Sequence, residues 1–146
     1  DAKALHALGN LHLSANGTLR DPSKAAGYLF RAAKRGHAEA QHMLGNLLAE
    51  GHGVPPDLNK AMEWYAKAAQ AGLPEAAMGL GHLYESDRAM GVDLPKAIEW
   101  YGKAGELYRK AGRKDDLAMI LRMLKGFAPR NPEAQVWIER LKDARM

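Results

Sequence analysis

The chain has 146 residues, of which 47% are hydrophobic and 26% are charged, a composition typical of one globular unit. It contains no cysteine, which excludes disulfide bonds, thiolate metal sites and cysteine nucleophiles. The net charge of +4 arises near the C-terminus, because residues 1–102 carry 10 basic and 11 acidic side chains whereas residues 103–146 carry 11 and 6.

A segment of 36 residues occurs three times in tandem. Residues 37–72 align without gaps on residues 1–36 and on residues 73–108, with 14 identical positions in each comparison. Repetition at this period is typical of supersecondary units that bury their apolar faces against one another. We therefore divide the chain into repeats at 1–36, 37–72 and 73–112, the third with an extended second helix, and a capping segment at 113–146, all in one domain.

Apolar residues recur at helical spacing twice in each repeat. We expect first helices near residues 2–15, 38–50 and 74–86, and second helices near residues 22–35, 57–71 and 94–111. The capping segment predicts a helix at 115–125, a turn at 126–130 and a last helix at 132–144, capped by Asn131 with Pro132 at its first position. The chain should therefore contain about eight helices.

Acidic residues and glycines mark the ends of the second helices. The helices should begin at N-caps formed by Asp21, Asp57 and Asp93. Gly36 and Gly72 should follow the first two helices in the left-handed conformation.

Other positions recur inside the helices. A glycine falls in the middle of each first helix, at Gly9, Gly45 and Gly81. Glycine there costs about 1 kcal/mol relative to alanine, so its recurrence predicts close approach of a second helix.

A pair of aromatic residues recurs in the second helices, which favours packing between helices: Trp64, Tyr65, Trp100 and Tyr101.

The middle repeat contains A-x-A-x-x-x-L-G-x-L, a glycine-containing loop, and then D-x-x-K-A-x-x-W-Y-x-K-A-A-x-x-G. This pattern resembles the Sel-one-like repeat, a relative of the tetratricopeptide repeat. The resemblance covers residues 1 to about 104. The first repeat departs from it at Tyr28-Leu29, and the third carries residues 86–90 where the loop is normally glycine-rich. The resemblance implies an all-α fold, a right-handed α-solenoid of antiparallel helix pairs.

The C-terminal segment is similar to the second half of a tetratricopeptide unit, through Leu117, Leu121, Leu124 and Pro129. Trp137, Ile138 and Leu141 of the last helix should cover the open end of the stack. Terminal repeats of solenoids are usually atypical in this way.

The resemblance implies a non-catalytic scaffold or adaptor that binds another protein or a peptide, with no cofactor. Bacterial members implied by it act in envelope complexes or as immunity proteins for secreted toxins, and the residues do not choose between these roles. The compartment stays open between the periplasm or cell envelope and the cytoplasm. No apolar run approaches the roughly 18 residues of a membrane span, so membrane insertion is not expected.

If the first helices follow tetratricopeptide geometry, as the resemblance implies, they line a concave face. The residues expected there are His6, Asn10, Leu13, Glu39, His42, Asn46, Glu50, Glu75, Met78, His82 and Glu85. Such polar side chains can pair with the backbone of an extended peptide. Because acidic residues outnumber basic ones on this face, we expect a neutral or basic segment, bound less tightly below about pH 6, where histidine becomes charged.

Other functions find less support in the sequence. The three serines lack the glycine context of a nucleophile, and no phosphate-binding loop is present, so a hydrolase is a weak alternative. The six histidines include no pair at i, i+4, so no metal site is expected. A nucleic-acid-binding module acting through the basic C-terminal part is a second alternative, although Asp115 and Asp116 follow its cluster, Arg109, Lys110, Arg113 and Lys114.

Overall fold

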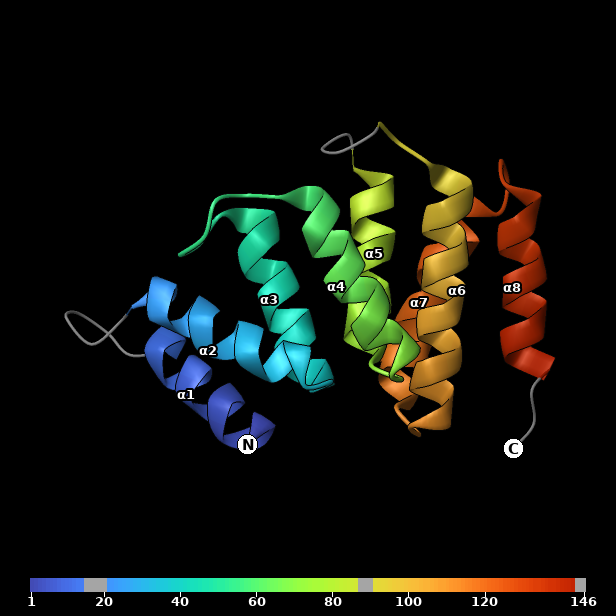
Figure 1. The fold of residues 1–146 in the computed structure, drawn as a ribbon. Coiled ribbons are helices and arrows are strands. Elements are labelled where there is room, and N and C mark those ends of the chain that lie inside the picture. Colours follow the sequence, from blue (N-terminus) through green and yellow to red (C-terminus); the bar gives the residue numbers. More distant parts are fainter. Residues whose placement is uncertain (15–20, 87–90, 144–146) are drawn as a thin grey trace. The chain divides into compact units, whose positions relative to one another are not determined.

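The computed structural model describes residues 1–14, 21–86 and 91–143, and the side chains within these ranges except those of residues 11–14 and 143. The described residues form helices and no strand (Figure 1). The helices are α1 Ala2–Ser14, α2 Pro22–Lys34, α3 Ala38–Glu50, α4 Leu58–Gln70, α5 Pro74–Glu85, α6 Leu94–Lys110, α7 Lys114–Phe127 and α8 Pro132–Asp143. The all-α prediction and its eight helices are confirmed.

One predicted boundary is wrong. The turn expected from residue 126 begins later, because α7 continues through Gly126 to Phe127. The backbone amide of Ala128 still donates to the carbonyl of Leu124 at 3.0 Å. The Asn131 side chain, expected to cap α8, donates instead to the carbonyl of Phe127 at 3.1 Å and so supports the last turn of α7.

The helices form two compact units, residues Asp1–Leu73 and Pro74–Met146. In unit 1, α1 packs on α2, α2 on α3 and α3 on α4. In unit 2, α5 packs on α6, while α6, α7 and α8 pack on one another. Each repeat thus forms a helix pair, as expected; the grouping of all four sequence segments in one domain stays a prediction.

The predicted aspartate N-caps and left-handed glycines of the second helices are confirmed. In α2, α4 and α6 the Oδ1 of the preceding aspartate accepts the backbone amide three residues later, at 3.1 Å in each case. These bonds satisfy an amide that has no partner inside the helix. Gly36 and Gly72 have φ of +86° and +100°, which a side-chain-bearing residue adopts only with strain.

The mid-helix glycines lie where a second helix approaches closely. A Cβ built on Gly45 would lie 2.6 Å from Cε1 of Tyr65, and one on Gly81 would lie 2.5 Å from the same atom of Tyr101. In the first repeat, Leu29 replaces the tyrosine and would lie 2.7 Å from a Cβ on Gly9. The glycines therefore make room for the side chain that fills the centre of each helix pair.

The two aromatic residues of each repeat differ in burial. Tyr65 and Tyr101 are 4% and 0% exposed and lie in the core, as predicted. The prediction is wrong for Trp64 and Trp100, which are only half-buried. Each indole lies beneath a lysine of the same helix, Lys67 at 4.7 Å and Lys103 at 4.4 Å from the ring centre. One position along a helix rotates a side chain by about 100°, which carries the tryptophan out of the core.

Helix α8 covers α6 and α7 in unit 2. A Cβ on Gly102 would collide with the indole of Trp137, and one on Gly105 would lie 2.8 Å from Leu141. Ile138 and Leu141 are buried, and so are Ile120 and Leu124 of α7. The residues predicted to cap the stack therefore pack against it within unit 2.

Candidate partner-binding surface

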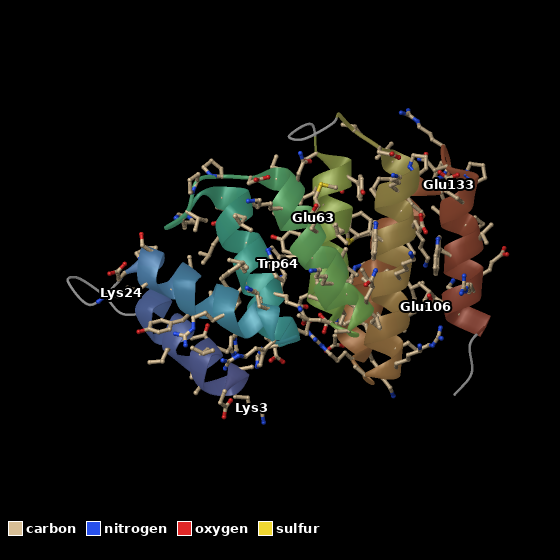
Figure 2. All side chains as sticks on the ribbon, viewed as in Figure 1. Lys3, Lys24, Glu63, Trp64, Glu106 and Glu133 are labelled. Carbon is tan, nitrogen blue, oxygen red and sulfur yellow. The ribbon has the colours of Figure 1, made fainter. Side chains whose placement is uncertain are left out.

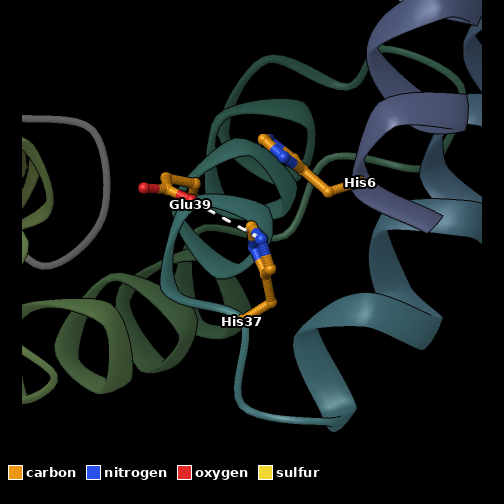
Figure 3. A group of neighbouring side chains, drawn as sticks. All are labelled: His6, His37 and Glu39. Carbon is orange, nitrogen blue, oxygen red and sulfur yellow. Dashed lines mark ion pairs between the residues drawn. The ribbon is translucent and has the colours of Figure 1, made fainter. Parts of the chain in front are cut away.

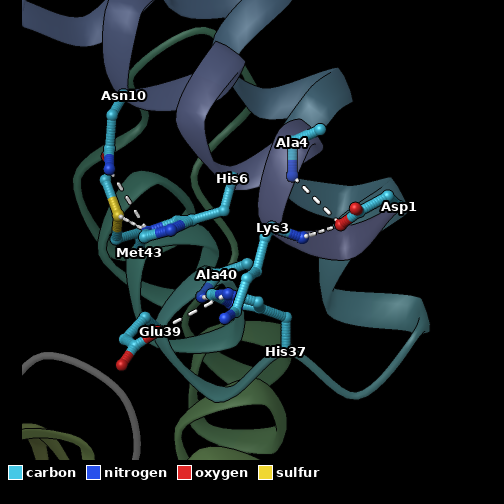
Figure 4. Close-up of polar contacts among 9 residues, drawn as sticks. All are labelled: Asp1, Lys3, Ala4, His6, Asn10, His37, Glu39, Ala40 and Met43. Carbon is cyan, nitrogen blue, oxygen red and sulfur yellow. Dashed lines mark hydrogen bonds and ion pairs between the residues drawn. The ribbon is translucent and has the colours of Figure 1, made fainter.

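In unit 1, His6 of the first repeat contacts the second repeat. Nε2 of His6 lies 3.3 Å from Nδ2 of Asn10, one turn along α1, and 3.2 Å from the sulfur of Met43 on α3 (Figure 4). His6, Asn10 and Met43 are all half-buried. The structure thus joins side chains of two repeats through Met43, which is not one of the predicted residues, and the predicted concave face stays a prediction. The side chain of Leu13 lies outside the described residues.

Behind these residues, His6 faces His37, which the sequence did not single out. The ring centroids lie 4.5 Å apart, and Nε2 of His37 lies 3.5 Å from a carboxylate oxygen of Glu39 (Figure 3). His37 is also the N-cap of α3, because its Nδ1 accepts the amide of Ala40 at 3.2 Å. Burial lowers the pKa of His6, His37 lowers it further, and Glu39 opposes the shift.

A buried tyrosine orients the predicted residues of the second repeat. The hydroxyl of Tyr65 donates to Oδ1 of Asn46 at 2.5 Å, and the ring lies 5.7 Å from that of His42. His42 and Asn46 are half-buried. Glu50, at the end of α3, is exposed and lies 3.0 Å from His52.

In unit 2, the buried Tyr101 contacts the predicted residues His82 and Glu85 in the same way. The hydroxyl of Tyr101 lies 3.0 Å from Nδ1 of His82 and donates to a carboxylate oxygen of Glu85 at 2.5 Å. Burial, and then Glu85, raise the pKa of Tyr101 well above its ordinary value, so the hydroxyl keeps its proton for this bond. His82 and Glu85 are both exposed residues of α5.

The two remaining predicted residues of unit 2 lie on the same helix. Met78 is half-buried. Glu75 accepts a hydrogen bond from Nη1 of Arg113 at 2.5 Å. The charge of Glu75 is therefore neutralised within unit 2. The predicted alignment of His6, His42 and Met78 in one line, and of Asn10, Asn46 and His82 in another, stays a prediction.

His6, His37 and Glu39 are also the one group of three potential metal ligands among the described residues, with ligand atoms within 4.8 Å of one another. A neutral imidazole has a single unprotonated nitrogen. In His37 this is Nδ1, which accepts the Ala40 amide, so Nε2 carries the proton and points to Glu39. Metal coordination through Nε2 would break the N-cap of α3, and these contacts therefore favour a hydrogen-bonded cluster.

The basic cluster of the C-terminal part lies at the turn between α6 and α7. Arg113 pairs with Asp116 as well as with Glu75, so part of the positive charge is neutralised. Arg109, Arg113 and Lys114 line a cleft of about 400 Å³ with Leu117 and Leu121. The ion pairs give no support to a nucleic-acid site, and that alternative stays untested.

The sequence does not predict the hydroxyl bonds of Tyr65 and Tyr101 or the contact of His37 with His6. Both depend on contacts between side chains of different helices, which the spacing along a single helix does not reveal. The recurrence of tyrosine 19 residues after Asn46 and after His82 is a signal that could have found the tyrosine bonds.

A family model described as Sel1 repeat matches residues 2–37, 38–73 and 74–108. A Sel1 repeat protein of Oxalobacter formigenes is similar in structure, with a TM-score of 0.68 and 27% identity over 73% of this chain and 81% of that one. A protective antigen of uropathogenic Escherichia coli strains, which displays an SLR fold, has a TM-score of 0.74 and 30% identity. That match covers 98% of this chain, which spans only 30% of the antigen.

A Pseudomonas aeruginosa protein shares the fold at a TM-score of 0.51 and 24% identity. None of the curated proteins matches the chain in sequence. Among the described residues, no helix is both long and apolar enough to cross a bilayer. Sel1 repeat proteins generally mediate protein–protein interactions and generally act as non-catalytic scaffolds. Since three consecutive matches extend over residues 2–108, the chain belongs to the Sel1 repeat family.

Proposed function

We propose that the polar faces of the first helices bind an extended segment of a partner protein, and that the chain works as a non-catalytic interaction scaffold. The observation that carries this proposal is the pair of buried tyrosines whose hydroxyls hold Asn46, His82 and Glu85 from behind. Side chains fixed before binding lose less conformational freedom when a ligand arrives. The tyrosines therefore support a surface that is prepared for recognition.

The chemistry of these side chains suits a peptide backbone. The hydroxyl of Tyr65 donates to Oδ1 of Asn46. Because Oδ1 faces this buried tyrosine, Nδ2 of Asn46 points away from the core and can donate to a ligand. Tyr101 contacts Nδ1 of His82, which directs Nε2 outward. An extended segment offers alternating carbonyl and amide groups that such donors and acceptors can meet.

The charges favour a neutral or basic segment. Arg113 neutralises Glu75, which leaves Glu39, Glu50 and Glu85 as the exposed acids among the proposed residues. Charge complementarity mainly raises the association rate and excludes wrong partners. An acidic segment should therefore bind poorly here.

The partner itself is proposed to be bacterial, either a component of a cell-envelope complex or a secreted toxin. The support for this is the bacterial origin of the similar structures and the resemblance of the repeats. Identification of the captured protein distinguishes the two.

The test is affinity capture from the organism that encodes the chain, with the bound protein identified by mass spectrometry. The double variant Asn46→Ala, His82→Ala should lose that protein, while Lys110→Ala, at an exposed position away from the proposed surface, should retain it. Circular dichroism checks that each variant is folded. Equal capture by the double variant and the parent would remove the first helices from recognition.

A further inference from the structure

Unit 1 contains an open cleft on the side of its second helices. The cleft has a volume of about 380 Å³ and lies between α2 and α4 over Leu44 and Leu48 of α3. Phe30 of α2 and Trp64 of α4 form its walls, in edge-to-face contact with ring centroids 6.1 Å apart. Figure 2 labels Trp64 on α4 and Lys24 on α2. Phe30 is 45% exposed, which is unusual for a large apolar side chain.

In unit 2, α8 takes the place of α4 beside α6, and the position equivalent to Phe30 is filled by a side chain of α8. Buried residues of α8 and α6 match when Trp137 is placed at the repeat position of Trp64 and Trp100. The indole of Trp137 lies on Gly102, which has no side chain. Gly102 occupies the repeat position of Phe30. In unit 1 the phenyl ring therefore occupies the position at which a glycine in unit 2 lets α8 pack on α6.

The two junctions also differ in charge: opposite charges pair across the junction in unit 2, whereas two lysines occupy the equivalent positions in unit 1. Arg140 of α8 pairs with Glu106 of α6 at 3.2 Å and also lies over Trp137. The repeat positions of these two charges hold Lys67 and Lys34 in unit 1. Lys34 lies 5.3 Å from the centre of the Phe30 ring and Lys67 lies 4.7 Å from that of Trp64. Each aromatic wall thus carries a lysine, and like charges cannot pair with each other.

The remaining charge around the cleft is also positive. Lys60 is the charged residue among those lining it. Helix α2 carries Lys24, Arg31 and Lys34 and no acidic residue. Glu63, the acidic residue of α4, does not line the cleft. An apolar cleft with a basic rim is complementary to apolar side chains flanked by carboxylates.

One glycine keeps the cleft open. Gly27 lines it, and a Cβ added there would meet nothing within 4 Å. The equivalent residues in the other repeats are Glu63 and Glu99, so a long polar side chain at this position is compatible with the fold.

We propose that the cleft between α2 and α4 is a second docking surface, which binds an acidic amphipathic helix of a partner protein. A bulky apolar side chain of that helix lies in the cleft against Phe30 and Trp64 and over Leu44 and Leu48. The carboxylates of the helix pair with Lys34 and Lys67. The contact of α8 with α6 supplies the precedent, since there a tryptophan and a charge three residues later engage a second helix. A small ligand would leave much of its surface in water in so open a site, whereas ligand pockets usually enclose their ligands.

The experiment uses two stapled helical peptides that differ only in charge. Both carry Trp and Leu four residues apart; one has Glu at the flanking positions and the other has Lys. Fluorescence anisotropy measures their affinity for the whole chain. The affinity of the Glu peptide should be at least about tenfold higher than that of the Lys peptide. The double variant Lys34→Glu, Lys67→Glu should instead bind the Lys peptide more tightly.

Two further variants separate the cleft from general attraction to a basic protein. Gly27→Gln should fill the cleft and weaken both peptides about tenfold while leaving the helical signal unchanged. Lys110→Glu, Lys114→Glu makes the same change of net charge in unit 2 and should leave binding as in the parent. Equal affinity for both peptides, or unchanged binding by Gly27→Gln, would overturn the proposal. So would a dimeric parent that Gly27→Gln converts to a monomer, because a second copy would then be the occupant.

Discussion

At the scale of single residues, one substitution should have opposite effects at two glycines. Gly45 faces the ring of Tyr65, and a Cβ there would lie 2.6 Å from it. Overpacking of this kind usually costs about 1–3 kcal/mol. Gly27 lies in a helix with open space around it, and alanine in a helix is favoured over glycine by about 0.5–1 kcal/mol. Gly45→Ala should therefore lower the free energy of unfolding and Gly27→Ala should raise it.

Urea denaturation followed by circular dichroism measures both changes. If Gly45→Ala also raises the free energy of unfolding, helix propensity, and not the approach of Tyr65, governs the site of Gly45.

A second residue-scale prediction concerns pH. Burial and His37 lower the pKa of His6 in the folded chain, whereas an unfolded histidine has a pKa of about 6.5. The unfolded state therefore binds more protons below this pH, and stability should decrease as the pH falls from about 6.5 towards the folded pKa of His6. His6→Gln should reduce this decrease. A melting temperature with the same pH dependence in parent and variant would assign the effect to other groups.

At the scale of elements, α8 should act as the cover of unit 2. Ile120 and Leu124 of α7 are 0% exposed, and α8 packs on both α6 and α7. Removing residues 131–146 would leave an apolar face open to water, and such faces drive association. Light scattering after size-exclusion chromatography should find oligomers and the melting temperature should be lower. A truncated chain that stays monomeric and has the melting temperature of the parent would show that α8 does not stabilise unit 2.

At the scale of the whole molecule, the charge distribution predicts how binding responds to pH. The chain carries +4 overall, yet the proposed inner residues include the exposed acids Glu39, Glu50 and Glu85. Histidine has an ordinary pKa of about 6.5, so acidification should add positive charge to this face, and a basic peptide should bind less tightly at pH 5.5 than at pH 7.5. The triple variant His6→Gln, His42→Gln, His82→Gln should lose most of this difference. If it keeps the difference, recognition lies on another surface.

Much of this architecture follows from the sequence, because repetition carries information that a single helix lacks. Recurrence at one position predicted the aspartate caps, the left-handed glycines and the close approach at Gly45. The hydroxyl bonds of Tyr65 and Tyr101 and the contact of His6 with His37 were not predicted, since they depend on how side chains from different helices meet. The prediction places the end of α7 too early because it treats Gly126 as a turn residue, whereas glycine also occurs inside helices. Gly126 makes no room for a neighbour, since an added Cβ would meet nothing within 4 Å.

The indole of Trp64 has an optical consequence. The chain has three tryptophans, and Trp64 alone belongs to unit 1, as the wall of its open cleft. In a Trp100→Phe, Trp137→Phe background, the emission of the remaining indole would report directly on whatever enters that cleft. A half-buried indole beside a lysine is in contact with water, so an occupant should shift its emission to shorter wavelength and protect it from iodide. The protein thus carries its own fluorescent reporter at the surface proposed to bind an acidic helix.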